Sequence, residues 1–463
     1  MSRSGAQRLT LYTGLGAGLG LLVGLLAPVP HVAAPIQHAL GIALFAALAW
    51  TGRPVPLEFS SLVVLLALPA TGLLSFAETF EAFTGPAVWL VFAGMVLSHM
   101  LLDLEMGQTL ADRMVGFLAG GRLRLLLSLH ALGLASAFLV PSAVVRVLLL
   151  LPLAEAVAAR LGNGDDRRLR ATVVLSLVCS TYFGGGGVLT GGVPNLVVVG
   201  QYQASTGITV YWSEWLAWMF PVNGLARTGL CAVVIWFLQA RHLPASWDRP
   251  APRAAREPDR RQWTAGAILT VGVLMWATDA VHHVPPVYVG LVLALLCIAP
   301  RWGPLPASSL RDLNFPFLLY LAALFAIGDA VQASGLGERF VSAGTASVGL
   351  GDAPLWARYL AVTAVTLPLD FLMDIAAVAG VTTPVIVDLA SGHGMQAMTA
   401  AMAVAMATTV VFLPYQSAPF MVPLEQRCIG LRDLVAAMTA ISALSVLLVT
   451  PLNLLYWSRM GWL

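Results

Sequence analysis

The sequence predicts an all-α polytopic membrane protein, with about eleven transmembrane helices and two re-entrant helical hairpins in an inverted-topology repeat. Hydrophobic residues make up 58% of the 463 residues, charged residues make up only 10%, and the mean hydropathy is +0.83. Soluble domains carry roughly 25% charged residues, so this composition excludes an ordinary water-soluble protein. Runs of about 20 apolar residues, the length of one helical crossing, recur along the chain. We therefore expect a multi-pass protein of the plasma (inner) membrane.

The apolar runs indicate where the helices lie. The first run, 9–27, is long enough to span a bilayer and further spans follow it, so we expect no cleavable signal peptide. Two interrupted segments, 125–160 and 356–390, carry Arg146 in the first and Asp370 and Asp374 in the second. A charge at membrane depth is costly and normally faces a partner, a cavity or a transported ion. The uninterrupted or merely broken spans are expected at 9–28, 35–51, 56–74, 86–104, 171–201, 217–239, 264–281, 286–300, 315–334, 398–426 and 433–457.

The arginine distribution indicates that each interrupted segment is a hairpin that returns to its own side of the membrane. With two hairpins, twenty of the 25 basic residues fall on the cytoplasmic side, and three, Arg339, Arg358 and Arg459, fall outside. The remaining two, Arg146 and Arg227, lie within membrane segments. This asymmetry obeys the positive-inside rule, whereas counting either segment as a full crossing reverses every later loop. We therefore expect a cytoplasmic N-terminus and a C-terminus outside.

A polar, proline-rich linker at 241–262 joins two halves that resemble each other. Each half carries a hairpin, a broken span and a closing helix, with Pro152 matching Pro384 and Pro194 matching Pro419. Paired interrupted segments in corresponding halves point to the binding site of a transporter built from inverted repeats. The expected parts are N-terminal scaffold helices at 1–124, a first transport part (hairpin, broken helix and closing helix) at 125–240, the cytoplasmic linker at 241–262, second scaffold helices at 263–355, and a second transport part at 356–463.

The two broken spans supply groups that bind ions. The first contains Thr181-Tyr-Phe-Gly-Gly-Gly-Gly-Val-Leu-Thr-Gly-Gly-Val-Pro-Asn195, whose glycines and proline interrupt a helix. The second contains Leu413-Pro-Tyr-Gln-Ser-Ala-Pro419. Unwound backbone at membrane depth persists only where it is buried in protein or lines a wet cavity. Its carbonyls suit a cation, and the N-terminus of the following helix suits an anion.

This layout resembles the divalent anion:sodium symporter family, the carriers of dicarboxylates, citrate and sulfate, over nearly the full length. Hairpins of that family carry Ser-Asn-Thr ten residues before a characteristic proline, and its broken spans carry Gly-Thr-Pro-Pro-Asn. Only Ser142 is kept of the six triplet positions, so the chain resembles a divergent member that lacks both intact motifs. The matching positions are Ser142, Ala143 and Val144, then Asp374, Ile375 and Ala376, with Gly192-Val-Pro-Asn195 and Ser417-Ala-Pro-Phe420 in the broken spans.

The resemblance implies where substrate and coupling ions bind. In the family, the triplets bind the carboxylates of the substrate, and nearby hairpin and broken-span groups bind two sodium ions. We expect no catalytic residue, no cofactor and no metal site, and the coupling ion is sodium or a proton. The substrate-binding candidates are Ser142, Ala143, Val144, Arg146, Pro194, Asn195, Ser417 and Pro419. The cation-coupling candidates are Ser142, Gly191, Gly192, Asp370 and Asp374.

The three hairpin charges leave alternatives open. Arg146 lies one helical turn after Ser142, where it either binds the anionic substrate directly or replaces one sodium ion. Asp370 and Asp374 have the i, i+4 spacing that places two side chains on one side of a helix, where they bind sodium or carry a proton. The alternative is a salt bridge between Arg146 and an aspartate that only joins the hairpins.

The sequence therefore predicts a cation-coupled secondary transporter of a small anion of the dicarboxylate, citrate or sulfate class, with elevator-type alternating access. An ion-coupled antiporter of the related arsenite or sodium/proton type is the alternative, followed by a channel. The sequence has no HExxH, GxSxG or phosphate-loop motif, which argues against a membrane enzyme. The expected partners are a small anionic substrate, the lipid bilayer and a second copy in a homodimer, without nucleic acid.

Overall fold

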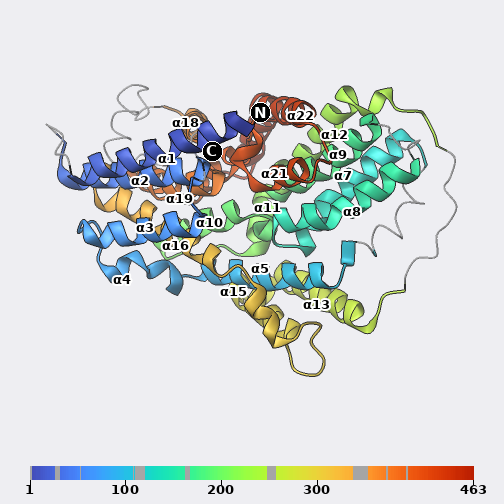
Figure 1. Cartoon of the computed structure of the whole chain (residues 1–463), viewed down its shortest axis with the longest axis horizontal. Helices are drawn as coiled ribbons and strands as arrows, with labels where there is room; N and C mark the ends of the chain where they lie inside the picture. The colour runs from blue at the N-terminus through green and yellow to red at the C-terminus, as the bar shows by residue number, and fades with distance from the viewer. Residues whose placement is uncertain are drawn as a thin grey trace.

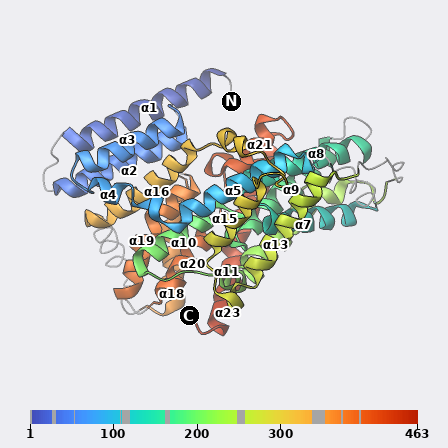
Figure 2. The same cartoon turned by 90° about the horizontal axis from the view of Figure 1, so that it is seen from below.

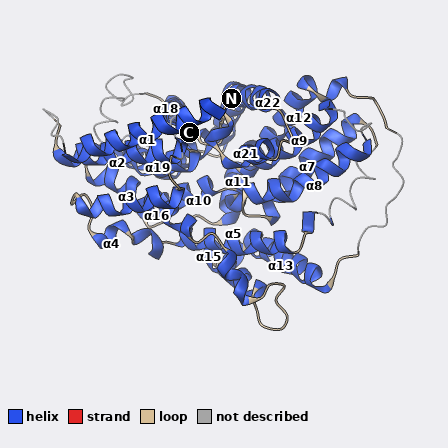
Figure 3. Ribbon diagram, in the orientation of Figure 1, coloured by secondary structure: helices blue, strands red, loops and turns tan. Residues whose placement is uncertain are grey.

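The computed structural model describes ten stretches of the chain, and the statements below concern these alone. They are residues 3–26, 32–52, 54–107, 109, 120–161, 167–247, 257–336, 353–371, 374–392 and 395–462. Every regular element in them is helical and none is a strand (Figure 3). The prediction of an all-α fold is confirmed for this part of the chain. Residues 248–256 of the predicted linker at 241–262 and the predicted outside residue Arg339 lie outside the described residues.

The helices of the first half follow the predicted spans, and the first interrupted segment becomes two helices joined by a short turn (Figure 1). In chain order, the elements are α1 (Arg3–Leu26), α2 (Ala34–Gly52), α3 (Leu57–Ala70), α4 (Phe76–Thr79), η1 (Glu81–Thr84), α5 (Pro86–Asp103), α7 (Arg122–Leu139), α8 (Ala143–Leu161), α9 (Arg167–Gly185), η2 (Leu189–Gly191), α10 (Val193–Thr206), α11 (Trp212–Met219), the π-helical η3 (Phe220–Ala226), α12 (Arg227–Leu238) and η4 (Ala240–His242).

The second half repeats this order. Its elements are α13 (Arg260–Ala277), α14 (Asp279–His282), α15 (Pro286–Cys297), η5 (Ala307–Asp312), α16 (Pro316–Ala333), α18 (Leu355–Asp370), α19 (Ile375–Gly392), α20 (Ala397–Ala407), η6 (Pro414–Gln416), α21 (Ala418–Glu425), α22 (Leu431–Leu444), the π-helical η7 (Ser445–Val449) and α23 (Thr450–Arg459). Five continuous helical stretches in the described residues are long and apolar enough to cross a bilayer, and several shorter apolar helices accompany them. The long stretches are Pro86–Asp103, Arg122–Leu139, Trp212–Leu238, Pro316–Ala333 and Leu431–Arg459.

The internal repeat is visible in the irregular elements. The 3-10 turns η2 and η6 begin at Leu189 and Pro414, 225 residues apart. The π-helical segments η3 and η7 begin at Phe220 and Ser445, again 225 residues apart. Because π-helical segments are rare in proteins, their recurrence at one spacing indicates two copies of the same closing helix.

The two halves are interleaved. Helix α3 packs on α16 of the other half, and α15, the counterpart of α3, packs on α5. Similarly, α10 packs on α19 and α20, and α21 packs on α8 and α9 (Figures 1 and 2). Each broken span therefore begins in its own half and ends against the hairpin of the other. This exchange brings both hairpin turns and both breaks to the middle of the molecule.

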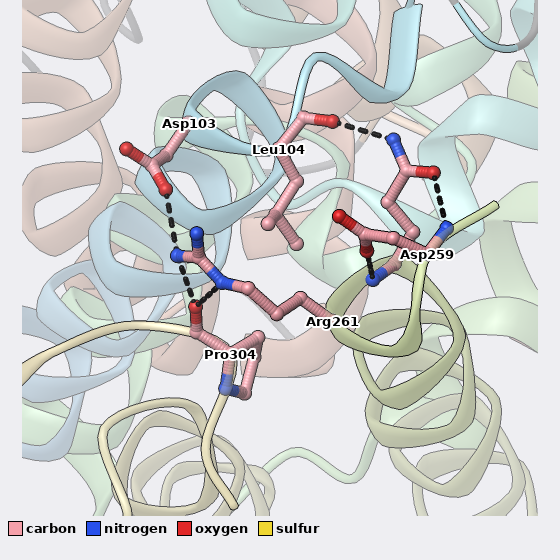
Figure 4. Close-up of polar contacts among 6 residues, drawn as sticks. Asp103, Leu104, Asp259, Arg261 and Pro304 are labelled. Atoms are coloured by element: carbon pink, nitrogen blue, oxygen red, sulfur yellow. Dashed lines mark hydrogen bonds and ion pairs between the residues drawn. The ribbon is translucent and has the colours of Figure 1, made fainter.

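Polar contacts between the start of α13 and the end of α5 hold helices of the two halves together. Arg261 at the start of α13 donates to the Asp103 carboxylate at 3.1 Å and to the Pro304 carbonyl, and Gln262 donates to the Leu104 carbonyl at 2.8 Å (Figure 4). Asp259 caps α13 by accepting the Gln262 N–H at 2.8 Å. These contacts fix α13 against the end of α5, which in turn contacts α8 and α10 around the central cavity.

Candidate functional site

Each hairpin turn places the start of a helix at the centre of the molecule. In the first, α7 ends at Leu139 and α8 begins at Ala143; in the second, α18 ends at Asp370 and α19 begins at Ile375. The second turn corrects one expectation: Asp370 and Asp374 do not share a helix face, because one helix ends at the first of them and the next begins after the second.

The two breaks have the same backbone course. Each runs from a helix through a turn to an extended residue, then through a 3-10 turn to a second extended residue that caps the next helix. Gly192, before α10, has φ −171° and ψ 150°, and Ser417, before α21, has φ −151° and ψ 125°. The prediction that both spans are broken is therefore confirmed, and each break turns a helix N-terminus toward the centre.

The hairpin turns and the breaks line one cavity of about 420 Å³. Four helix N-termini meet there, those of α8, α10, α19 and α21. Unpaired backbone N–H groups and the positive end of the helix dipole make each one favourable for negative charge. The sequence-predicted residues that line the cavity are Ser142, Ala143, Val144, Gly191, Gly192, Pro194, Asn195, Asp374, Ser417 and Pro419. The remaining two candidates, Arg146 and Asp370, are fully buried and are absent from the lining.

Arg146 is bound by backbone carbonyls. Its Nη1 donates to the Val140 carbonyl at 2.8 Å, and its Nη2 donates to the Thr181 carbonyl at 2.9 Å and the Gly191 carbonyl at 2.6 Å. These oxygens belong to the first hairpin turn, the last turn of α9 and the η2 turn. The side chain therefore joins the hairpin to the break from behind the cavity.

The two aspartates of the second hairpin have different surroundings. Asp374 faces the cavity, and its Oδ1 accepts the Ala376 N–H at 2.9 Å and the Tyr320 hydroxyl at 3.4 Å. Asp370 is fully buried, and neither of its carboxylate oxygens has a hydrogen-bond partner among the described residues. Its backbone carbonyl accepts the Gln416 amide at 2.6 Å, so the second hairpin is also tied to its break.

Gln416 and Asn195 hold the breaks in shape. The Gln416 Oε1 accepts two backbone N–H groups, from Phe412 at 2.7 Å and Leu413 at 2.6 Å. The Asn195 amide donates to the Val188 carbonyl at 2.9 Å. These bonds satisfy backbone groups that the interrupted helices leave open.

Sequence reasoning missed several residues of the cavity wall. Trp50 and Tyr320 reach it from α2 and α16 with their rings 4.9 Å apart, edge to face. Neither residue interrupts its apolar helix, so the sequence gives no signal for them. The adjacent hydroxyl residues Thr408 and Thr409, just before the second break, are a sequence signal for a polar cavity wall. The other polar or aromatic wall residues outside the predicted set include Tyr182, Thr408, Thr409, Tyr415 and Glu425.

Comparison with known proteins places this geometry in a family. The model of the CitMHS family, described as citrate transporter, matches residues 43–410, which include both hairpins and the first break. The chain belongs to this citrate transporter family. Members of the family are transporters, so this chain is an integral membrane transporter and not an enzyme, as the sequence predicted.

Three related proteins match between 38% and 72% of this chain. A "Membrane protein" of Cupriavidus necator is 25% identical over 72% of this chain and 69% of its own length. The sodium-dependent dicarboxylate transporter SdcS of Staphylococcus saprophyticus is 26% identical over 38% of this chain and 36% of its own length. Dicarboxylate transporter 1 of Arabidopsis thaliana chloroplasts is 25% identical over 62% and 53%. The matches to the two dicarboxylate transporters thus span about a third to a half of their lengths. They support the predicted resemblance to the divalent anion:sodium symporters.

A solved structure supports the fold of this family member. The YdaH transporter of Alcanivorax borkumensis has a TM-score of 0.59 and 16% identity, with 94% of this chain and 99% of that chain covered. At this identity the likeness concerns the fold alone. It confirms the prediction of a polytopic helical membrane protein.

Proposed function

We propose that this protein is a cation-coupled secondary transporter of a small anion of the dicarboxylate, citrate or sulfate class. The observation that carries the proposal is the meeting of four helix N-termini at one central cavity. The N-termini of α8, α10 and α21 attract negative charge, and Ser142, Asn195 and Ser417 add polar side chains there. At the N-terminus of α19, the carboxylate of Asp374 already accepts a backbone N–H. The family description and the dicarboxylate transporters among the relatives favour the same substrate class.

The second hairpin is the proposed coupling site. Asp374 offers a carboxylate to the cavity, and Asp370 lies buried with both oxygens unbonded in the described residues. An isolated buried carboxylate is costly, so a proton or a sodium ion that neutralises it is strongly favoured. The relative SdcS, which is named as sodium-dependent, favours sodium.

The proposal includes alternating access of the elevator type, with the two hairpin-and-break parts moving against the scaffold helices. It places the N-terminus in the cytoplasm and the C-terminus outside, as the positive-inside rule favours. It also includes a homodimer in the plasma (inner) membrane. Mass photometry of the purified protein in nanodiscs would contradict the dimer by giving the mass of a single 48.9 kDa chain.

Uptake into proteoliposomes tests the proposed activity. Purified protein would be given radiolabelled succinate, citrate or sulfate, with an inward sodium gradient and an inward proton gradient imposed separately. We expect saturable accumulation of one of these anions that needs one of the two gradients. Large ohmic currents without accumulation would instead identify a channel.

A second candidate is a cation antiporter of the sodium/proton type, and one observation favours it. The charged side chains of the cavity wall in the described residues are both acidic, Asp374 and Glu425. The distinguishing experiment measures sodium/proton exchange with a pH-sensitive dye in vesicles that contain no organic anion or sulfate. Exchange under these conditions would favour the antiporter, whereas exchange that requires an anion would favour the symporter.

A further inference from the structure

The carbonyl oxygens around Arg146 form the kind of site that binds a dehydrated monovalent cation. The guanidinium is fully buried, and its described partners are the carbonyls of Val140, Thr181 and Gly191. A buried cation is stable only where polar groups replace its water. Unwound backbone carbonyls do this for alkali ions in membrane proteins. Here the cation they surround is part of the protein.

Two glycines keep the space for this cation open. A Cβ atom at Gly185 would lie 2.5 Å from Arg146 Nη2 and 3.1 Å from the Gly191 carbonyl oxygen. A Cβ atom at Gly191 would overlap the Gly185 carbonyl. A side chain at Gly185 would therefore displace the guanidinium, and one at Gly191 would push apart the backbone segments of the break beside it.

The guanidinium of Arg146 is separated from the cavity but lies close enough to make the electrostatic potential there more positive. Gly191 lines the cavity, whereas Arg146 lies behind it and is absent from the lining. The guanidinium thus holds the first hairpin turn against the first break and adds a fixed positive charge close to the N-termini of α8 and α10. In the described residues of the second half, the amide of Gln416 joins the hairpin to its break instead.

We propose that Arg146 is a built-in cation that permanently occupies a cation site formed by the first hairpin and the first break. This half of the protein therefore binds no mobile coupling cation, and coupling depends on the second half alone. The inference rests on the proposed cation-coupled function, but its test below requires no transport.

The test measures the thermal unfolding midpoint of the detergent-solubilised protein in sodium, potassium, choline or methylguanidinium chloride at equal ionic strength. In Arg146→Ala the three carbonyls are left without a cation. We expect sodium or methylguanidinium to raise the midpoint of this variant by about 5 °C or more over choline, and to change the wild-type midpoint far less. Arg227→Ala is the matched control, because Arg227 is equally buried but has no carbonyl partners in the described residues. We expect no such cation effect in it.

Two further variants keep the proposal falsifiable if Arg146→Ala does not fold. Arg146→Lys keeps the positive charge, and Arg146→Gln fills the space with a neutral amide. We expect the lysine variant to unfold at a higher temperature than the glutamine variant in choline. The proposal is overturned if the glutamine variant is at least as stable as the lysine variant. It is equally overturned if the folded alanine variant responds to the four salts as the wild type does.

Failure of this inference is distinguishable from failure of the proposed function. Wild-type protein that transports no anion in proteoliposomes refutes the function, whatever the unfolding midpoints are. Anion uptake by the wild type together with an alanine variant that is insensitive to sodium and methylguanidinium refutes the inference alone.

Discussion

Asp370 and Asp374 lie four residues apart, yet the second hairpin turn places them in different surroundings. Asp374 is held at the start of α19 by the Ala376 N–H and faces the cavity. Asp370 is buried behind it with no bonded carboxylate oxygen in the described residues. The first is positioned to meet a solute in the cavity. In the proposed transport cycle, a proton or a cation neutralises the second.

Neutralising Asp370 should uncouple transport from the cation gradient. An asparagine has nearly the same shape but no charge, so Asp370→Asn is expected to lower gradient-driven accumulation at least about tenfold. This corresponds to the loss of one charge-assisted contact, worth about 1.5–3 kcal/mol. Exchange of internal for external substrate should persist, because it needs no net cation movement. Both activities are measured in proteoliposomes.

Asp388→Asn is the matched control for this prediction. Asp388 lies in the same hairpin, in helix α19, but its carboxylate accepts the exposed Gln332 amide at 2.6 Å and is absent from the cavity wall. We expect near-normal accumulation in this variant. Normal accumulation in Asp370→Asn would contradict a coupling role for that residue.

Gln416 should be important for stability, because one buried side chain satisfies three backbone groups. Its amide accepts the N–H groups of Phe412 and Leu413 and donates to the Asp370 carbonyl. Each group left unsatisfied costs about 1–3 kcal/mol, so Gln416→Ala is expected to lower the free energy of unfolding by roughly 3 kcal/mol or more. Reversible unfolding in detergent would measure this. Gln203→Ala, which removes a half-buried amide bonded to Thr209, should change stability by less than about 0.5 kcal/mol.

At the scale of elements, the sequence indicated the hairpins and breaks because glycine, proline and buried charge act locally. The run of glycines before Pro194 interrupts a helix whatever surrounds it. The packing of α10 on α19, and of α21 on α8, joins segments that no local pattern connects. The i, i+4 expectation for Asp370 and Asp374 failed for the same reason, since spacing alone does not tell where a hairpin turns.

The contact between α16 and α19 should tolerate no added side chain. A Cβ at Gly328 would lie 2.6 Å from the Gly380 carbonyl oxygen and 2.7 Å from the Gln201 amide nitrogen. Gly328→Ala is therefore expected to destabilise the protein by about 1–3 kcal/mol and to slow uptake, because α16 and α19 belong to parts that move relative to each other in the proposed cycle.

A second glycine in a scaffold helix supplies the comparison. Gly266 of α13 has open space where a Cβ would lie. Gly266→Ala should leave uptake unchanged and stabilise the helix by about 0.5–1 kcal/mol, since alanine is the better helix former. Equal uptake and equal unfolding midpoints in the two alanine variants would show that the α16–α19 contact is not tightly packed.

For the whole molecule, the sequence predicted the hairpin-turn and break residues that line the cavity but not the rest of the cavity wall. Ten of the twelve candidate residues line one cavity, because all of them belong to hairpin turns or breaks that the interleaved halves bring together. Trp50, Tyr182 and Tyr320 complete the wall but are indistinguishable in sequence from packed aromatic residues. The carbonyl contacts of Arg146 also required the structure, since backbone oxygens leave no pattern in a sequence.

The orientation of the chain is a prediction about the whole molecule, and it follows from the distribution of the arginines. The arginines favour a cytoplasmic N-terminus and a C-terminus outside. Alkaline phosphatase, which is active only outside, should therefore be active when fused after the C-terminus. Green fluorescent protein, which fluoresces only inside, should be dark there.

Fusions within the linker at 241–262 should give the opposite pattern, because this arginine-rich segment is predicted to be cytoplasmic. The second half of the chain lies between the linker fusion site and the C-terminal fusion site. Comparing the two fusions therefore also tests whether the second hairpin crosses the membrane. If that hairpin were a full crossing, the C-terminus would return to the cytoplasm and both positions would give fluorescent, phosphatase-inactive fusions. That outcome would refute the inverted arrangement of the two halves, and with it the proposal that α8, α10, α19 and α21 point their N-termini at one substrate from opposite sides of the membrane.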